Sequence, residues 1–302
     1  MVKNLVLENV SVGFKLPQGV FYAVDDVSLS LPGGNFTAII GESGCGKSVL
    51  GQAILNILPS GVIKKGRVLY NGEQVEKILS AFGIIPQNPS ESLNPVRKIG
   101  KQMQDILAVH NIADSDNSYK KQCLHLFGLQ EADRVLAAYP HELSGGMLQR
   151  VLCAMAVSSK PEWILADEPT KGLDEQVGAV VRKNLLTIKQ DLHLSMLIIT
   201  HDIALAQEVC DDVLVMYAGQ VLEHNADIWH KPLHPYTKGF LKALPKNGLQ
   251  VIPGKAPVPG ESFTGCKFAA RCPYCTTRCK EEKPAMQQVG NAEVRCFLYA
   301  EG

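Results

Sequence analysis

The sequence Gly41-Glu-Ser-Gly-Cys-Gly-Lys47-Ser48 matches the pattern G-x-x-x-x-G-K-[ST] at every fixed position. It follows a short apolar run, Phe36–Ile40, and precedes Ser48–Leu58, which has the spacing of a helix. Glycines allow successive backbone N–H groups to curl around phosphates, and a helix N-terminus adds partial positive charge. We expect Lys47 to contact the β- and γ-phosphates of a nucleotide and Ser48 to offer a hydroxyl to Mg²⁺. The residues expected to form this cradle are Gly41, Ser43, Gly44, Cys45, Gly46, Lys47 and Ser48, with Cys45 contributing only backbone.

A second buried strand ends in two adjacent carboxylates, in the sequence Trp163-Ile-Leu-Ala-Asp167-Glu168. Because side chains alternate along a strand, the two carboxylates point in different directions. Asp167 is then placed to hold Mg²⁺ through its water shell, and Glu168 to face an attacking water. A phosphate cradle upstream and such a strand downstream predict a nucleoside triphosphatase.

Length and composition set the broad class. The chain has 302 residues, of which 46% are hydrophobic, so about two domains with real cores are expected. Its 30 basic and 30 acidic side chains balance, which argues against nucleic acid as a partner. The longest apolar runs are far shorter than the roughly 18–20 residues that cross a bilayer, and the N-terminus lacks a signal-peptide pattern. We expect a soluble, cytoplasmic protein.

Strand-like and helix-like segments alternate along the chain, which predicts an α/β core with a largely parallel sheet. Residues 5–31 favour several short strands, and residues 88–160 favour a helical subdomain. Asp174 is the expected cap of a helix whose apolar face would be Val177, Val180, Val181, Leu185 and Ile188. The helices predicted between 88 and 160 are Met103–Val109, Tyr119–Phe127 and Met147–Val157. Further strands are predicted at Arg67–Tyr70, Trp163–Ala166, Met196–Thr200, Val213–Tyr217 and Val221–Glu223.

A second anion-binding helix end is predicted at Leu143-Ser-Gly-Gly-Met147, where Ser144 is a good N-cap and Gly145 and Gly146 leave backbone N–H groups bare. With these motifs in this order, residues 1–225 resemble the ATP-binding subunits of ABC transporters. The resemblance implies a P-loop nucleotide-binding domain made of a RecA-like core, an antiparallel β subdomain and the helical subdomain at about 88–160.

The resemblance also assigns roles to single residues. Gln87 resembles the Q-loop glutamine, which contacts Mg²⁺, and His201 resembles the switch histidine, which holds the γ-phosphate. Phe14 stands where an aromatic stacks on adenine, with Tyr22 as the competing candidate. Glu168 would act as the general base. The segment Leu143–Met147 resembles the signature motif, and Gly172-Leu-Asp174 resembles the D-loop. Met147 in the first and Lys171 just before the second depart from the commoner residues.

The same resemblance implies a head-to-tail dimer. ATP would lie between the Lys47 cradle of one subunit and the helix end at Ser144, Gly145 and Gly146 of the other. Nucleotide at this seam adds contacts only in the closed state, so its binding would drive closure and its hydrolysis would release it.

Five of the nine cysteines lie in a proline-punctuated tail, residues 226–302, which we treat as a small irregular C-terminal domain. In a reducing compartment four thiolates suit an iron–sulfur cube or a tetrahedral zinc ion. The tail resembles that of oligopeptide, dipeptide and nickel importers, in some of which such cysteines bind a [4Fe–4S] cluster. The positions that match those ligands are Cys266, Cys272, Cys279 and Cys296, with Cys275 as a spare thiol or an alternate ligand. Zinc and thiols without a ligand are the alternatives to the cluster.

The resemblance therefore predicts an ATPase subunit of an ABC importer of oligopeptides or dipeptides, at the cytoplasmic face of the membrane. Its expected partners are a second, different ATPase subunit, two transmembrane permease subunits and an external solute-binding protein. Import of nickel or a metal chelate is one alternative. A soluble ABC-type ATPase outside transport is another, and a redox- or metal-sensing role for the tail is a third.

Overall fold

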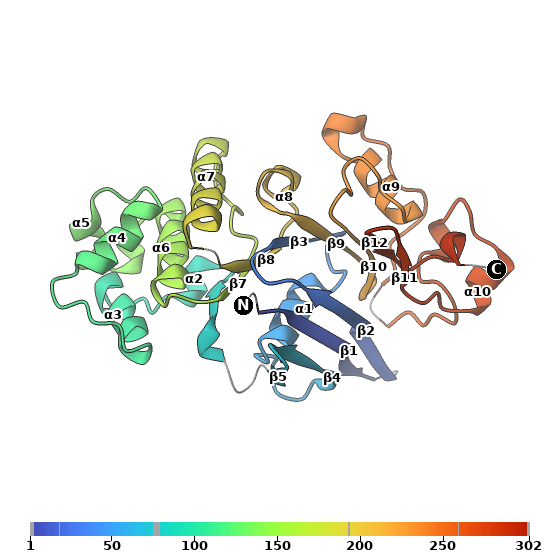
Figure 1. Cartoon of the computed structure of the whole chain (residues 1–302), viewed down its shortest axis with the longest axis horizontal. Helices are drawn as coiled ribbons and strands as arrows, with labels where there is room; N and C mark the ends of the chain where they lie inside the picture. The colour runs from blue at the N-terminus through green and yellow to red at the C-terminus, as the bar shows by residue number, and fades with distance from the viewer. Residues whose placement is uncertain (1–2, 18, 75–78, 193, 259, 301–302) are drawn as a thin grey trace.

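The computed structural model describes residues 3–17, 19–74, 79–192, 194–258 and 260–300. Its centre is a large sheet (Figure 1) in the order β11-β12-β10-β9-β3-β8-β7-β6. The five strands from β9 to β6 run parallel, as the α/β prediction required. The strands of this sheet are β3 (Phe36–Ile40), β6 (Phe82–Ile85), β7 (Trp163–Asp167), β8 (Ser195–Ile199), β9 (Asp212–Tyr217), β10 (Gln220–Asn225), β11 (Gln287–Val289) and β12 (Ala292–Val294).

A smaller antiparallel sheet has the order β2-β1-β4-β5, with strands β1 (Leu5–Leu16), β2 (Gly19–Leu31), β4 (Ile63–Tyr70) and β5 (Glu73–Gln74). The prediction of several short strands within residues 5–31 was wrong, because β1 and β2 form one long hairpin. Its irregularities are register shifts within the hairpin, which bend a strand without ending it.

The helices are α1 (Lys47–Ile54), α2 (Pro89–Ser92), α3 (Ile99–Val109), α4 (Ser118–Leu126), α5 (Ala132–Ala137), α6 (Gly145–Ser158), α7 (Glu175–Leu192), α8 (Ile203–Val209), α9 (Pro235–Lys242) and α10 (Thr277–Glu281). Helices α2 to α6 gather at one end of the molecule (Figure 1), and all five lie between residues 89 and 158. The first helix ends at Ile54 rather than at Leu58, and Asn56 just beyond it adopts a left-handed φ of 54°.

Helix α7 buries one face, as predicted, but that face is narrower than expected. Val181, Leu185 and Ile188 are fully buried, whereas Val180 is 40% exposed. The cap prediction is confirmed, since the Asp174 Oδ1 atom accepts a hydrogen bond from the Val177 N–H at 2.9 Å.

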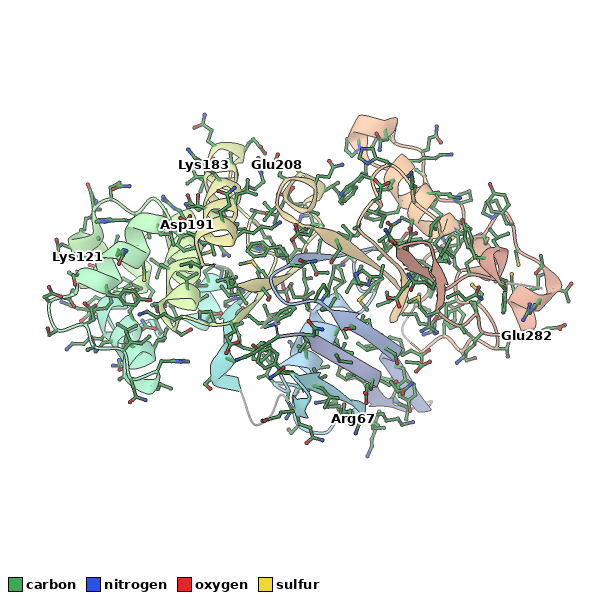
Figure 2. All side chains as sticks on the ribbon, in the orientation of Figure 1. Arg67, Lys121, Lys183, Asp191, Glu208 and Glu282 are labelled. Atoms are coloured by element: carbon green, nitrogen blue, oxygen red, sulfur yellow. The ribbon has the colours of Figure 1, made fainter. Side chains whose placement is uncertain are left out.

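The tail extends the large sheet. Strand β12 pairs with β10 through Glu223 and Val294, and β11 pairs with β12 at the outer edge. Charged side chains of both signs project from the surface, as Figure 2 shows for Lys121, Lys183 and Glu282. In the described part of the chain, no helix has both the length and the apolar character that crossing a membrane requires.

Candidate nucleotide-binding site

The loop between β3 and α1 has a backbone path that only glycine permits at two positions. Gly41 has a φ of 150° and Gly46 a φ of 103°. A Cβ atom on Gly46 would lie 2.1 Å from the Ala23 carbonyl oxygen, and one on Gly41 would lie 2.2 Å from that of Met216. The loop is therefore packed directly against the backbones of β2 and β9.

Lys47 closes this loop on itself. Its Nζ atom donates hydrogen bonds to the carbonyl oxygens of Gly41, at 2.9 Å, and Glu42, at 3.0 Å. Gly46 precedes the helix without a side chain that caps it. A half-buried cation beside an uncapped helix N-terminus is suited to binding phosphate.

Asp167 and Ser48 meet beside this loop. The Asp167 carboxylate accepts a hydrogen bond from the Ser48 hydroxyl, but burial outweighs that bond and raises the pKa of Asp167. Its Oδ1 atom is buried and has no hydrogen-bond partner among the described residues. An orphaned carboxylate oxygen beside a hydroxyl is a donor set that suits Mg²⁺.

Glu168 and His201, from the ends of β7 and β8, are brought together. The Glu168 Oε2 atom lies 2.7 Å from His201 Nδ1 and 3.3 Å from the His201 backbone N–H, which donates to it. Thr200 also donates its hydroxyl at 3.4 Å, a contact that the sequence analysis did not identify. Glu168 is buried with a left-handed φ of 53°, while the His201 ring is 67% exposed. A fixed carboxylate faces an accessible imidazole, and such a pair can accept and transfer a proton.

Gln87 and the two candidate adenine-stacking residues lie at the edges of this region. Gln87 is exposed just after β6, at the same edge of the sheet as Asp167, because Ile85 pairs with Ala166 of β7. Tyr22 lines a cavity of about 300 Å³ together with Gly44, whereas Phe14 is half-buried against the core. Of the two aromatics, Tyr22 is the one that shares this cavity with a residue of the loop.

The second predicted anion site is the start of α6. The Ser144 hydroxyl oxygen accepts a hydrogen bond from the Met147 N–H at 3.3 Å, as expected of an N-cap. Ser144 and Gly145 are exposed, and a Cβ atom on Gly145 would meet nothing within 4 Å. A Cβ atom on Gly146 would lie 3.6 Å from Leu173, so the segment before α7 packs beside this helix end.

The tail cysteines gather around one cavity of about 170 Å³. Its lining includes Cys266, Cys272, Cys279 and Cys296. Cys275 is outside that lining. Over the described ranges, no three His, Cys, Asp or Glu side chains are grouped so that they could hold a metal ion.

Comparison with known proteins gives consistent results. Residues 24–171 match the family model described as ABC transporter, and residues 222–279 match the one described as oligopeptide/dipeptide transporter, C-terminal region. The oligopeptide transport ATP-binding protein OppD of Haemophilus influenzae is 34% identical over 316 residues, 98% of each chain. The dipeptide transport ATP-binding protein DppD of Escherichia coli is 36% identical over 306 residues, 95% of this chain and 94% of its own.

Solved structures agree with the fold. The ATP-binding cassette MJ0796, in a dimeric post-hydrolysis state bound to ADP and Pi, superposes with a TM-score of 0.64 and 26% identity. The match covers 73% of this chain and 97% of that one.

Proposed function

We propose that this chain, which belongs to the ABC transporter family of ATP-binding and ATP-hydrolysing subunits, powers the import of oligopeptides or dipeptides. The observation that carries the peptide assignment is the match of residues 222–279 to the oligopeptide/dipeptide transporter C-terminal region. Relatives named for oligopeptide and dipeptide transport align over almost the whole chain, including this tail.

In the proposed site, the loop from Gly41 to Ser48 binds the phosphates of ATP. Lys47 exchanges its bonds to loop carbonyls for contacts with the β- and γ-phosphates. Mg²⁺ is held by Ser48 and Asp167, with Gln87 approaching from the neighbouring strand, and it neutralises charge on the phosphates when bound. The adenine stacks on Phe14 or Tyr22.

Glu168 is the proposed general base. Its carboxylate is fixed by hydrogen bonds from Thr200 and the His201 backbone, so it can accept a proton from an attacking water in one orientation. His201, exposed beside it, holds the γ-phosphate. The complementary contacts come from Ser144, Gly145 and Gly146 of a second subunit, with Asp174 at the seam.

The partners proposed are a different but related ATPase subunit, two permease subunits in the membrane and an external solute-binding protein. With no described helix able to cross a bilayer, the chain would be held at the cytoplasmic face by the permease. We propose the boundary between the ATPase domain, residues 1–225, and the C-terminal extension, residues 226–302, at the end of β10.

We also propose that the four-cysteine cavity holds a [4Fe–4S] cluster. The support is that four thiols line one cavity, and four thiolates are the ligand set of such a cluster. The same four thiolates would also suit a tetrahedral zinc ion. Anaerobic purification followed by iron, sulfide and zinc analysis tests this, and zinc without sulfide would overturn it.

Reconstitution of the assembled transporter tests the import function. ATP hydrolysis in vesicles should rise when the external binding protein is loaded with peptides, and labelled peptide should accumulate. The matched Glu168→Gln complex should do neither. Stimulation by nickel or a chelate but by no peptide would replace the proposed cargo, and hydrolysis indifferent to the permease would favour a role outside transport.

A further inference from the structure

Three buried basic side chains join the tail to the nucleotide-binding domain, and each is the sequence neighbour of a cavity-lining cysteine. Lys267 is 8% exposed and Arg295 is 7% exposed, and the Arg271 side chain is 7% exposed. The neighbours are Cys266 with Lys267, Cys272 with Arg271, and Cys296 with Arg295.

Arg271 reaches into the phosphate loop. Its Nη1 and Nη2 atoms lie 3.0 and 3.1 Å from the Oε2 and Oε1 atoms of Glu42, in a bidentate pair. The Glu42 backbone N–H donates to the hydroxyl of buried Tyr236 at 3.1 Å, and its carbonyl accepts from Lys47. The tail thus contacts both the side chain and the backbone of Glu42, and the Glu42 carbonyl oxygen is itself hydrogen-bonded to Lys47.

Lys267 contacts two segments next to those against which the same loop packs. Its Nζ atom lies 2.9 Å from Asp25 Oδ2 and 2.7 Å from the Ala218 carbonyl oxygen. Burial alone would raise the pKa of Asp25, but the hydrogen bond and charge of Lys267 outweigh it and lower that pKa. Because Gly46 packs against Ala23 and Gly219, which flank these two anchors, Lys267 fixes the surface on which the loop rests.

Arg295 adds a third link. Its Nη2 atom donates to the Asp26 carbonyl oxygen at 3.0 Å, next to the residue that Lys267 holds. Burying three cations is costly, and buried ion pairs contribute little net stability compared with apolar packing. All three contacts nevertheless connect the thiol cavity with the strands and loop of the nucleotide site.

We propose that residues 266–272 couple the four-cysteine cavity to the phosphate loop, with Arg271 as the positioning residue. Lys267 and Arg271 lie between Cys266 and Cys272 in the sequence. A bound group or a change in the thiols that holds the two cysteines in place therefore also holds these two basic residues in place. These two residues hold the loop in its nucleotide-binding shape. The state of the cysteines therefore sets nucleotide affinity, and the inference rests on the proposed binding of nucleotide at Lys47.

Equilibrium binding of Mg·ADP to the full chain tests this coupling. Arg271→Gln and Cys272→Ser should each raise the Kd about 5- to 20-fold, in the range of ordinary coupling between sites. The double variant should bind Mg·ADP no more weakly than the weaker-binding single variant, because both substitutions act through one link. Arg271→Lys, which keeps the charge, should recover part of the loss.

Matched controls separate this link from general damage to the tail. Cys275→Ser removes a thiol outside the cavity, and Arg278→Gln removes a cavity-lining cation whose described partners, Glu282 and the Phe297 ring, both lie within the tail. Both should keep the Kd within twofold of the unmodified chain. The proposal would be overturned if either control bound Mg·ADP as weakly as Arg271→Gln does. It would also be overturned if the two effects added in the double variant, or if Arg271→Gln left the Kd unchanged.

A second measurement needs no substitution. If the loop and the cysteine segment are coupled, Mg·ADP should slow the alkylation of Cys266 and Cys272 in the unmodified chain, resolved by peptide mass. Where Arg271→Gln folds, the same protection should be absent from it. Equal rates with and without nucleotide would contradict the coupling. Failure of the unmodified chain to bind Mg·ADP at all would instead contradict the proposed function.

Discussion

The two helix ends proposed to bind phosphate, at the start of α1 and at the start of α6, are built in opposite ways. The α1 end is enclosed by its own chain: Gly41 and Gly46 press on neighbouring strands, and Lys47 bonds to the loop. The α6 end is open, with Ser144 and Gly145 exposed.

The glycines show what this difference means. Gly46 has a left-handed φ and lacks room for a Cβ atom, so its own fold requires glycine. A Cβ atom on Gly145 would have open space, so no described residue of its own subunit excludes one. If glycine is needed there, the need comes from something that approaches from outside. We therefore regard α1 as a finished half-site and α6 as one that a second chain completes.

The largest effect we expect is from Glu168→Gln, which tests whether the chemistry belongs to the α1 half-site. Loss of the general base should slow hydrolysis about 10²–10⁴-fold while ATP binding is retained. Single-turnover hydrolysis, with binding measured on the same sample, checks this. An unchanged single-turnover rate would remove Glu168 from its assigned role.

Gly46→Ala should be next, because it forces a side chain into the enclosed half-site. Its Cβ atom would lie 2.1 Å from a backbone oxygen that cannot move aside, at a φ of 103°. The strain and the displaced loop should raise the Kd for Mg·ATP about 10- to 100-fold.

Gly44→Ala is the matched control for that change. Gly44 also has a positive φ, of 77°, but its Cβ atom would meet nothing within 4 Å. Its effect should be smaller, since it carries only the backbone strain. If both substitutions weaken binding equally, close packing does not shape the loop and the contrast between the two ends fails.

Much of the enclosed half-site was predictable from sequence, because its parts are local. The fixed positions of the loop, the carboxylates at the end of β7 and the cap at Asp174 lie within short segments whose spacing carries the geometry. The contact of Glu168 with His201 depends on two parallel strands that end side by side. The resemblance to a family gave each of these residues a role but did not pair them.

The contacts of the tail with the loop were not predictable from spacing. Arg271 and Glu42 are 229 residues apart, and no local pattern marks a buried salt bridge at that separation. The hairpin of β1 and β2 was also missed. Pro17 and Gly19 mark its single turn, but bulges also interrupt the alternation within the strands, so the pattern resembled several short strands. Long-range packing thus decided the features that local signals left out.

Gly145→Val tests the open half-site. The chain alone should keep its melting temperature and its Kd for Mg·ATP, because a Cβ atom at this position meets no described atom within 4 Å. Hydrolysis by the assembled pair should fall about 10-fold or more, since the side chain occupies the place of the partner's nucleotide. Unimpaired hydrolysis, or binding lost already in the isolated chain, would show that α6 does not complete a neighbour's site.

The smallest effect separates the two roles of Ser144, as a cap and as a phosphate ligand. Its bond to Met147 is long, at 3.3 Å, and exposed, so Ser144→Ala should lower the free energy of unfolding by only about 0.5–1 kcal/mol. Ser144→Asp keeps the cap and should restore that stability. It also places a negative charge where the partner's γ-phosphate would approach, so hydrolysis by the assembled pair should fall below that of Ser144→Ala. Thermal unfolding and hydrolysis measured on both variants check this; hydrolysis that simply follows stability would mean that Ser144 acts only as a cap.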